Sequence, residues 1–127
     1  MNTSEASKAE PGLQHIRMQD IPVEQLNPLL DRQFVSGERS MLARIFLRKG
    51  CVVPMHSHDN EQISYIVEGA LKFCVGDAEI VVAAGEVLII PALMPHSAEA
   101  LEDTVDLDIF APPRADWIQG TDAYLRK

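Results

Sequence analysis

Short runs of apolar and β-branched residues alternate with polar breaks from residue 29 to residue 110 of this chain. Each break contains Gly, Pro, Asp or Asn, the residue types that favour turns. Nine runs have the length and composition of strands: 33–36, 41–47, 51–55, 62–67, 71–75, 79–82, 87–90, 96–100 and 105–110. Many short strands with a turn signal between each pair are typical of a sandwich or barrel. The pattern therefore predicts an all-β fold.

The two ends of the chain lack this alternation and predict short helical turns. Near the N-terminus, Asp20–Pro22 has the composition of a helix start, and Asn27–Pro28 stops that helix after about one turn. Beyond the last strand, residues 114–118 and the segment around Tyr124 predict two further helical turns. Helical structure is thus expected only at the edges of the β-rich region.

The length of 127 residues fits one domain, and the composition argues against several classes of partner. Residues 1–12 are polar and predict a disordered lead-in to a single domain over residues 13–127. The net charge of −8, without a basic run, argues against nucleic acid, which clusters of Lys and Arg bind. No apolar run reaches the roughly 18 residues of a membrane span, and no secretion signal is present. Two isolated cysteines, Cys51 and Cys74, fit free thiols in a reducing compartment, so we expect a cytoplasmic protein.

Three of the four histidines form a pattern that indicates a metal site. His56 and His58 are two residues apart, so in an extended segment their side chains point to the same side. Gln62 keeps the same parity, whereas Glu61, the stronger donor, falls on the opposite side. His96 follows a Pro-bounded turn after a later strand. Imidazole is the commonest metal ligand, so the sequence predicts one divalent metal ion near these residues.

The last predicted strand, 105–110, has an aliphatic side and a second side made of Asp106, Asp108 and Phe110. Two interpretations of the second side stay open: a solvated acidic face, or a face that lines the cavity of the barrel. Arg114 follows a stiff Ala-Pro-Pro connector that can fold it back over the mouth of the barrel.

Two segments, 50–69 and 85–100, resemble the paired motifs of the cupin family. In the first segment, the residues at cupin spacing are Gly50, His56, His58, Gln62 and Gly69. In the second segment they are Gly85, Pro91 and His96, with Leu93 and Ala100 where the motif has Gly and Asn. The resemblance covers about residues 30–112 and implies a single-domain cupin. That fold is a double-stranded β-helix, or jelly-roll barrel, and cupins of this size commonly pair as homodimers.

The cupin resemblance implies that His56, His58, Gln62 and His96 together bind one divalent ion, namely Ni, Zn, Mn or Fe. Gln62 stands where the motif has an acid, so all four ligands are neutral and leave the charge of the ion uncompensated. A neutral ligand set favours a small anionic substrate and strengthens Lewis acidity.

The stretch 107–117 resembles a narrower group, the KdgF-type cupins of pectin and alginate degradation. That resemblance implies linearisation of 4,5-unsaturated uronates, the monosaccharides that polysaccharide lyases release, to an open-chain keto form. Carried over, Asp108 matches the catalytic acid, Phe110 an aromatic wall, and Arg114 the residue that binds the substrate carboxylate. We therefore expect a metal-dependent isomerase or tautomerase of small sugar acids that works without redox change.

Four further side chains have weaker assignments. Met55 and Met94 flank the ligand histidines and are candidates for substrate-binding walls of the pocket, with core filling as the alternative. For Trp117 and Tyr124 in the tail, the sequence predicts packing or a dimer contact in preference to contact with substrate.

Two other functions stay open. One is a cupin dioxygenase that uses Fe and O₂ on a small organic substrate, although iron oxygenases more often include a carboxylate ligand. The other is a non-catalytic module that binds a metal or a sugar acid.

Overall fold

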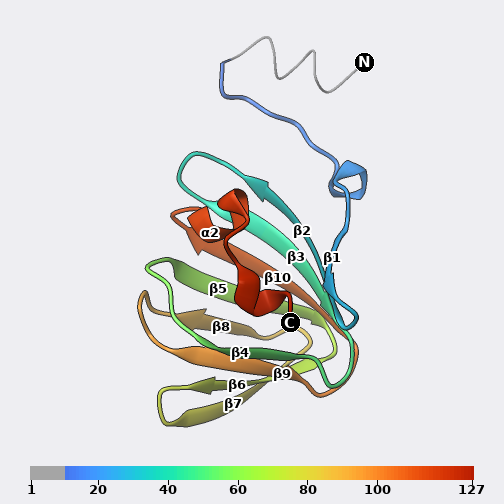
Figure 1. The fold of residues 1–127 in the computed structure, drawn as a ribbon, viewed down its shortest axis with the longest axis vertical. Helices are drawn as coiled ribbons and strands as arrows, with labels where there is room; N and C mark the ends of the chain where they lie inside the picture. Colours follow the sequence, from blue (N-terminus) through green and yellow to red (C-terminus); the bar gives the residue numbers. More distant parts are fainter. Residues whose placement is uncertain (1–10) are drawn as a thin grey trace.

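A computed structural model describes residues 11–127, in which ten antiparallel strands form two sheets around one core (Figure 1). The strands are β1 Glu24–Asn27, β2 Leu30–Ser36, β3 Met41–Leu47, β4 Val52–His56, β5 Glu61–Glu68, β6 Ala70–Val75, β7 Ala78–Ala83, β8 Val87–Ile90, β9 His96–Ala100 and β10 Thr104–Ala111. The short helices are η1 Met18–Asp20, α2 Ala115–Gln119 and η2 Ala123–Leu125. The all-β prediction is therefore confirmed, and helices occur only towards the two ends.

The order of the strands brings distant parts of the chain together. The larger sheet has the order β1-β2-β3-β10-β5-β8, and the smaller sheet has the order β4-β9-β6-β7. In the smaller sheet, His56 of β4 pairs with His96 of β9. In the larger sheet, Gln62 of β5 lies opposite Phe110 of β10. The two histidine-bearing segments and the acidic strand thus meet in one barrel, although they are far apart in the sequence.

Alternation along each strand separates the core from the outer surface. In β3, Met41, Ala43, Ile45 and Leu47 are buried, while Leu42 is exposed on the other face. The smaller sheet contributes buried side chains to the same core: Leu71, Phe73, Val82, Ala98 and Ala100. Burial of apolar surface, at roughly 25 cal/mol per Å², holds the two sheets against each other.

The predicted N-terminal helical turn is present as η1, but it ends at Asp20, where the sequence predicted it to start, and a strand, β1, follows. β1 and β2 form a hairpin whose turn contains Asn27 and Pro28, the residues expected to stop a helix. The Asn27 side-chain oxygen accepts a hydrogen bond from the Leu29 amide and stabilises this turn. Leu26 is buried in the core, and this tertiary burial outweighs the local helical preference.

The C-terminal tail, red in Figure 1, folds back over the barrel. Its α2 and η2 confirm the two helical turns predicted there. A buried ion pair joins the tail to β2, because Arg32 Nη1 donates a hydrogen bond to Asp122 Oδ2 at 2.6 Å. Asn27 Nδ2 also donates to the Leu125 carbonyl oxygen. These contacts fix the tail in one position across the barrel.

Three further predictions concern the chain as a whole. The predicted disordered lead-in lies outside the described residues except for Pro11 and Gly12, which form a turn. Cys51 and Cys74 have free thiols, as expected. Within residues 11–127, no helix combines the length and the apolar character that crossing a membrane requires. The cytoplasmic location stays a prediction.

Four positions of the paired motifs have left-handed backbone, namely Gly50, Gly69, Gly85 and Leu93, and two of them are tightly constrained. Gly69 has φ +88°, and a Cβ there would collide with the Asp103 carbonyl and with Thr104. Leu93 adopts φ +68° where the motif has glycine, a conformation that costs an L-residue about 1–2 kcal/mol. The Leu93 amide donates to the His58 carbonyl oxygen at 2.7 Å, so this turn is tied to the loop of the first motif.

Candidate metal centre

Three imidazoles converge at one end of the space between the sheets. His56 ends β4, His96 begins the neighbouring β9, and His58 lies in the loop after β4. One ring nitrogen from each imidazole lies within 4.8 Å of the other two. The structure therefore brings together the three histidines that the sequence assigns to a metal.

Backbone carbonyl groups orient each ring. The Nδ1 atoms of His56, His58 and His96 lie 2.7, 3.1 and 2.9 Å from carbonyl oxygens two residues away in the chain. A carbonyl oxygen only accepts hydrogen bonds, so each Nδ1 carries the proton and donates it. Each Nε2 then has a free lone pair, which is the arrangement of metal-ligating histidines.

The orientation of the Gln62 amide is set by Ser64. Ser64 Oγ donates to Asp108 Oδ1 at 2.6 Å, so it accepts a hydrogen bond from Gln62 Nε2 at 2.9 Å. Gln62 Oε1 therefore faces His58 Nε2, at 3.2 Å. Both atoms carry lone pairs and therefore repel each other at this distance. A positive charge between them removes the repulsion. This contact fits a shared cation.

A divalent ion also fits the burial of the rings. His96 Nε2 is buried and has no hydrogen-bond partner among the described residues. Burial lowers the pKa of His56 and of His58 to about 4, and it lowers the pKa of His96 as well. The nearby positive charge of Arg114 acts in the same direction on all three rings. The rings are therefore neutral near pH 7, and their lone pairs are available to an ion.

Strand β10 carries two acids into the same cavity. Asp106 and Asp108 are 3% and 4% exposed, and both line the cavity together with Phe110. The interpretation as a solvated acidic face is therefore wrong, because β10 lies between β3 and β5 and the smaller sheet covers its inner side. Burial raises the pKa of both carboxyl groups, most strongly that of Asp106. Hydrogen bonds from Ser64 and Asp106 oppose the rise at Asp108.

Arg114 folds back over the barrel and is held by groups of the tail. Its Nε and Nη2 donate to the two carboxylate oxygens of Asp116 at 2.9 and 2.8 Å, and Nη2 also donates to the Tyr124 hydroxyl. The guanidinium lies 5.0 Å from the Phe110 ring centre and 4.9 Å from that of Trp117. Arg114 Nη1 has no partner in the part of the chain that the structure describes, so it can bind a carboxylate.

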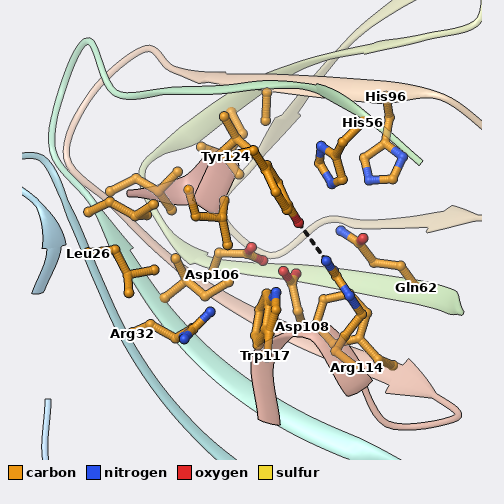
Figure 2. A pocket seen from close by; sticks show the side chains of 18 of the residues that line it. Leu26, Arg32, His56, Gln62, His96, Asp106, Asp108, Arg114, Trp117 and Tyr124 are labelled. Atoms are coloured by element: carbon orange, nitrogen blue, oxygen red, sulfur yellow. Dashed lines mark hydrogen bonds between the residues drawn. The ribbon is translucent and has the colours of Figure 1, made fainter. Parts of the chain in front are cut away.

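One cavity of about 60 Å³ joins most of these side chains (Figure 2). Its polar lining includes His56, Gln62, His96, Asp106, Asp108 and Arg114. In Figure 2, His56, His96 and Gln62 lie at one end, Leu26 and Arg32 at the other, and the two acids between them. The Tyr124 ring closes one wall by stacking on His56, with ring centres 4.8 Å apart. A concave site of this kind takes a small ligand.

The remaining predicted residues are spread over several environments. Met55 and Met94 are exposed and do not belong to the lining of this cavity. Core filling is therefore the wrong alternative for them, and their contact with substrate stays a prediction. Glu61 is exposed and Gln62 is buried, as strand alternation predicts. Trp117 is buried against two phenylalanine rings, which is the packing role predicted for it, and it also lines the cavity, which the sequence did not predict.

Three residues of the site are not assigned to it from the sequence. Ser64 shares the strand parity of Gln62, so alternation alone marks it as inward-facing. Asp116 and Tyr124 reach Arg114 through the path of the tail, which no local pattern encodes. The predicted role of Tyr124, packing or a dimer contact, is incomplete, because its ring also lines the cavity. The dashed line in Figure 2 marks its bond with Arg114.

Comparison with known proteins gives one family match. The family model described as the cupin domain matches residues 44–111, just over half of the chain. Among curated proteins, none matches this chain.

Solved structures with the same fold include the following three proteins, which come from different organisms. An RmlC-like cupin from Shewanella frigidimarina NCIMB 400 is 28% identical with a TM-score of 0.74, over 78% of this chain and 90% of that chain. KdgF from Halomonas sp. is 25% identical with a TM-score of 0.73, over 78% of this chain and 93% of that chain. A variant of oxalate decarboxylase from Bacillus subtilis is 19% identical with a TM-score of 0.71, over 76% of this chain but 29% of that chain. The last similarity shows the fold alone.

Proposed function

The chain belongs to the cupin family, and on this premise we propose that it is a metal-dependent isomerase of a small sugar acid. The substrate that we favour is a 4,5-unsaturated uronate, converted to its open-chain keto form without redox change. The observation that carries the proposal is a cluster of three imidazoles, two of which line one small cavity together with the Asp108 carboxyl and the Arg114 guanidinium. The similarity to KdgF from Halomonas sp. supports the proposal, because residues 107–117 also resemble KdgF-type cupins.

The ligands of the ion would be His56, His58, Gln62 and His96, with Ni, Zn, Mn or Fe as the metal. A bound divalent ion supplies Lewis acidity, which stabilises negative charge on a substrate oxygen. Since the four side chains are neutral, they would leave the charge of a bound ion uncompensated next to Arg114. A small anion is therefore the favoured ligand.

In this proposal the proton transfer is assigned to Asp108, whose buried carboxyl lines the cavity. Its carboxylate would take the proton of the substrate C1 hydroxyl, and the ring bond between C1 and O5 breaks as the C1 carbonyl forms. The electron pair moves onto O5, beside the C4–C5 double bond, and a proton delivered to C4 completes the ketone at C5. The hydroxyl loses the proton that carbon gains, so no co-reactant is needed. The hydrogen bond from Ser64 to Oδ1 orients the carboxylate for this exchange.

Arg114 would bind the substrate carboxylate. Its Nη1 is the guanidinium nitrogen without a partner in residues 11–127, while Asp116 and Tyr124 hold the rest of the group in place. A charge-assisted hydrogen bond there would orient the substrate ring against the flat face of Phe110.

Asp108→Ala tests this assignment by separating catalysis from metal binding. The variant should keep the metal content of the wild type, because Asp108 is not a ligand, and should lose about 10²–10⁴ in turnover. Turnover is followed under argon by the loss of ultraviolet absorbance of the conjugated double bond, and metal is measured by elemental analysis. Asp77→Ala, in the exposed turn between β6 and β7, is the control that should keep both properties.

Full activity of Asp108→Ala would refute Asp108 as the proton carrier. Wild-type turnover that requires O₂ would favour a dioxygenase. Metal binding without turnover of any unsaturated uronate would favour a non-catalytic module.

We also propose a second copy of this chain as a partner, bound at the outer face of the larger sheet. Exposed apolar side chains cover this face across four adjacent strands: Leu42, Ile109, Tyr65, Val67, Val87 and Ile89. An apolar patch of this kind is typical of an interface, and the same face of a second copy can cover it by sheet-on-sheet packing. The net charge of −8 opposes association through polar faces. Light scattering should give the mass of a dimer, and Ile109→Lys should give a folded monomer; a monomeric wild type contradicts the proposal.

A further inference from the structure

Four buried polar atoms of cavity-lining residues have no hydrogen-bond partner among residues 11–127. His96 Nε2 is one of the proposed metal ligands, and Arg32 Nε belongs to a guanidinium that is paired with Asp122. The other two are Asp106 Oδ1 and Trp117 Nε1, whose indole lies near the Tyr124 hydroxyl without a hydrogen bond of good geometry to it. Their side chains are 3% and 6% exposed, and both residues line the cavity. A buried polar atom without a partner costs about 1–3 kcal/mol, so such atoms usually bond to a ligand or to water. The reaction proposed above uses neither atom.

The strand register places Asp106 at a defined distance from the metal ligands. Along β10, Phe110 lies opposite Gln62, Asp108 follows two residues further along the strand, and Asp106 two residues beyond it. Each step of two residues advances about 6.6 Å along a strand. Figure 2 shows the same order, with the Asp106 carboxylate and the Trp117 indole on the far side of Asp108 from Gln62. The two unpartnered atoms therefore belong to the inner part of the cavity.

The hydrogen-bonding roles of these atoms define the group that they can bind. The indole N–H of Trp117 only donates, and Asp106 Oδ1 accepts. A ligand hydroxyl can accept from the first and donate to the second at the same time. A carboxylate has no hydrogen for Asp106 and would meet the Asp108 carboxyl next to it, and an ammonium group cannot accept from Trp117. A neutral hydroxyl is the group that satisfies both atoms.

We propose that Asp106 and Trp117 form a hydroxyl-binding subsite, which selects a hydroxy acid whose carboxylate lies at the Arg114 and imidazole end. The inference rests on the function proposed for this cavity, and it adds the residues that select the substrate. A small dicarboxylate such as oxalate lacks the hydroxyl and binds without using this subsite.

The test measures binding to the full chain loaded with Zn²⁺, by titration calorimetry. The probes are D-galacturonate, a uronate without the double bond that the proposed reaction needs, and oxalate. The variants are Trp117→Phe and Asp106→Leu, and Asp77→Leu in an exposed turn is the control. Each cavity variant should bind D-galacturonate at least tenfold more weakly, equivalent to about 1.4 kcal/mol, while oxalate affinity changes less than twofold. The control should bind both probes as the wild type does.

Three results would overturn the subsite: a wild type that does not bind D-galacturonate, cavity variants that bind it unchanged, or an equal loss for oxalate. Thermal unfolding of each variant shows whether it is folded, and Trp117→Phe decides alone if Asp106→Leu does not fold. Turnover of an unsaturated uronate is measured separately. If the cavity variants lose D-galacturonate affinity as expected but the wild type does not turn over an unsaturated uronate, the subsite stands and the proposed reaction is refuted. If the wild type turns the uronate over but the variants bind D-galacturonate unchanged, only the subsite is refuted.

Discussion

Asp122→Ala tests how the tail that closes the cavity is attached to the barrel. Arg32 and Asp122 are 1% and 0% exposed, and the Arg32 Nη1 to Asp122 Oδ2 distance is 2.6 Å. After the substitution, the longer contact to Glu24, at 3.4 Å, is the one ion pair left to Arg32 among the described residues, beside its packing on the Trp117 and Phe34 rings. Arg32 Nε is already without a hydrogen-bond partner there. The variant therefore leaves a buried positive charge with little compensation.

The expected cost follows from that burial. Breaking a buried ion pair by removing one partner costs about 3–5 kcal/mol, which is a large part of the roughly 5–15 kcal/mol that stabilises a domain. We expect the cost to appear first as release of the tail, residues 114–125, because local opening is cheaper than global unfolding. Release would move Tyr124 away from His56 and open the cavity.

Urea unfolding measures the loss of stability, and hydrogen exchange of the amides in residues 114–125 measures release of the tail. The matched variant is the double substitution Arg32→Met with Asp122→Leu, which replaces the pair by apolar groups. It should recover most of the loss, because no buried charge is left unpaired. Two results would refute the reasoning. One is a loss of unfolding free energy below about 1 kcal/mol in Asp122→Ala. The other is a loss in the double variant that equals the sum of the losses in the two single variants.

The same ion pair predicts a pH dependence. Burial alone would raise the pKa of the Asp122 carboxyl, but hydrogen bonds from Arg32 and Arg126 outweigh it and hold the pKa below the ordinary value of 3.8. The folded state then binds fewer protons at this site than the unfolded state. The stabilisation is therefore present above pH 3.8 and is lost as the pH falls through the lowered folded-state pKa. Asp122→Ala should remove this part of the acid sensitivity.

Three other predictions concern backbone strain and the metal ligands. Gly69→Ala should lower the free energy of unfolding by about 1–3 kcal/mol or more, because its Cβ collides with β10 at positive φ; an unchanged melting temperature contradicts this. Leu93→Gly should raise stability by about 1 kcal/mol in thermal unfolding, because Leu93 is 66% exposed and strained, and a lower melting temperature would show the strain to be negligible. Metal-free protein should lose stability as the pH falls from 6.5 towards about 4, because unfolded imidazoles take up protons that the buried His56 and His58 do not. Added metal should raise the melting temperature in calorimetric scans across this pH range, because the rings that bind it stay unprotonated there, and an unchanged melting temperature would count against the metal site.

Local patterns determined the strands and the side on which each residue of a strand lies. All nine predicted runs correspond to strands, and 41–47, 87–90 and 96–100 coincide with β3, β8 and β9. Parity placed Gln62 inside and Glu61 outside, because successive side chains of a strand point to opposite faces. The spacing of the histidines was enough to indicate a shared ion. These features depend on neighbours within a few residues, so the sequence carries them directly.

The tertiary structure decided what each face meets. Whether the acidic side of β10 was solvated or enclosed depended on the smaller sheet, which the chain contributes from distant segments. The strand at residues 24–27, where a helix was predicted, depended on burial of Leu26 and on pairing with β2. The bonds of Tyr124 and Asp116 with Arg114 depended on the tail, which the Arg32–Asp122 pair holds from 90 residues away in the chain. Such contacts follow from packing over the whole barrel, and a periodic pattern in one segment does not contain that information.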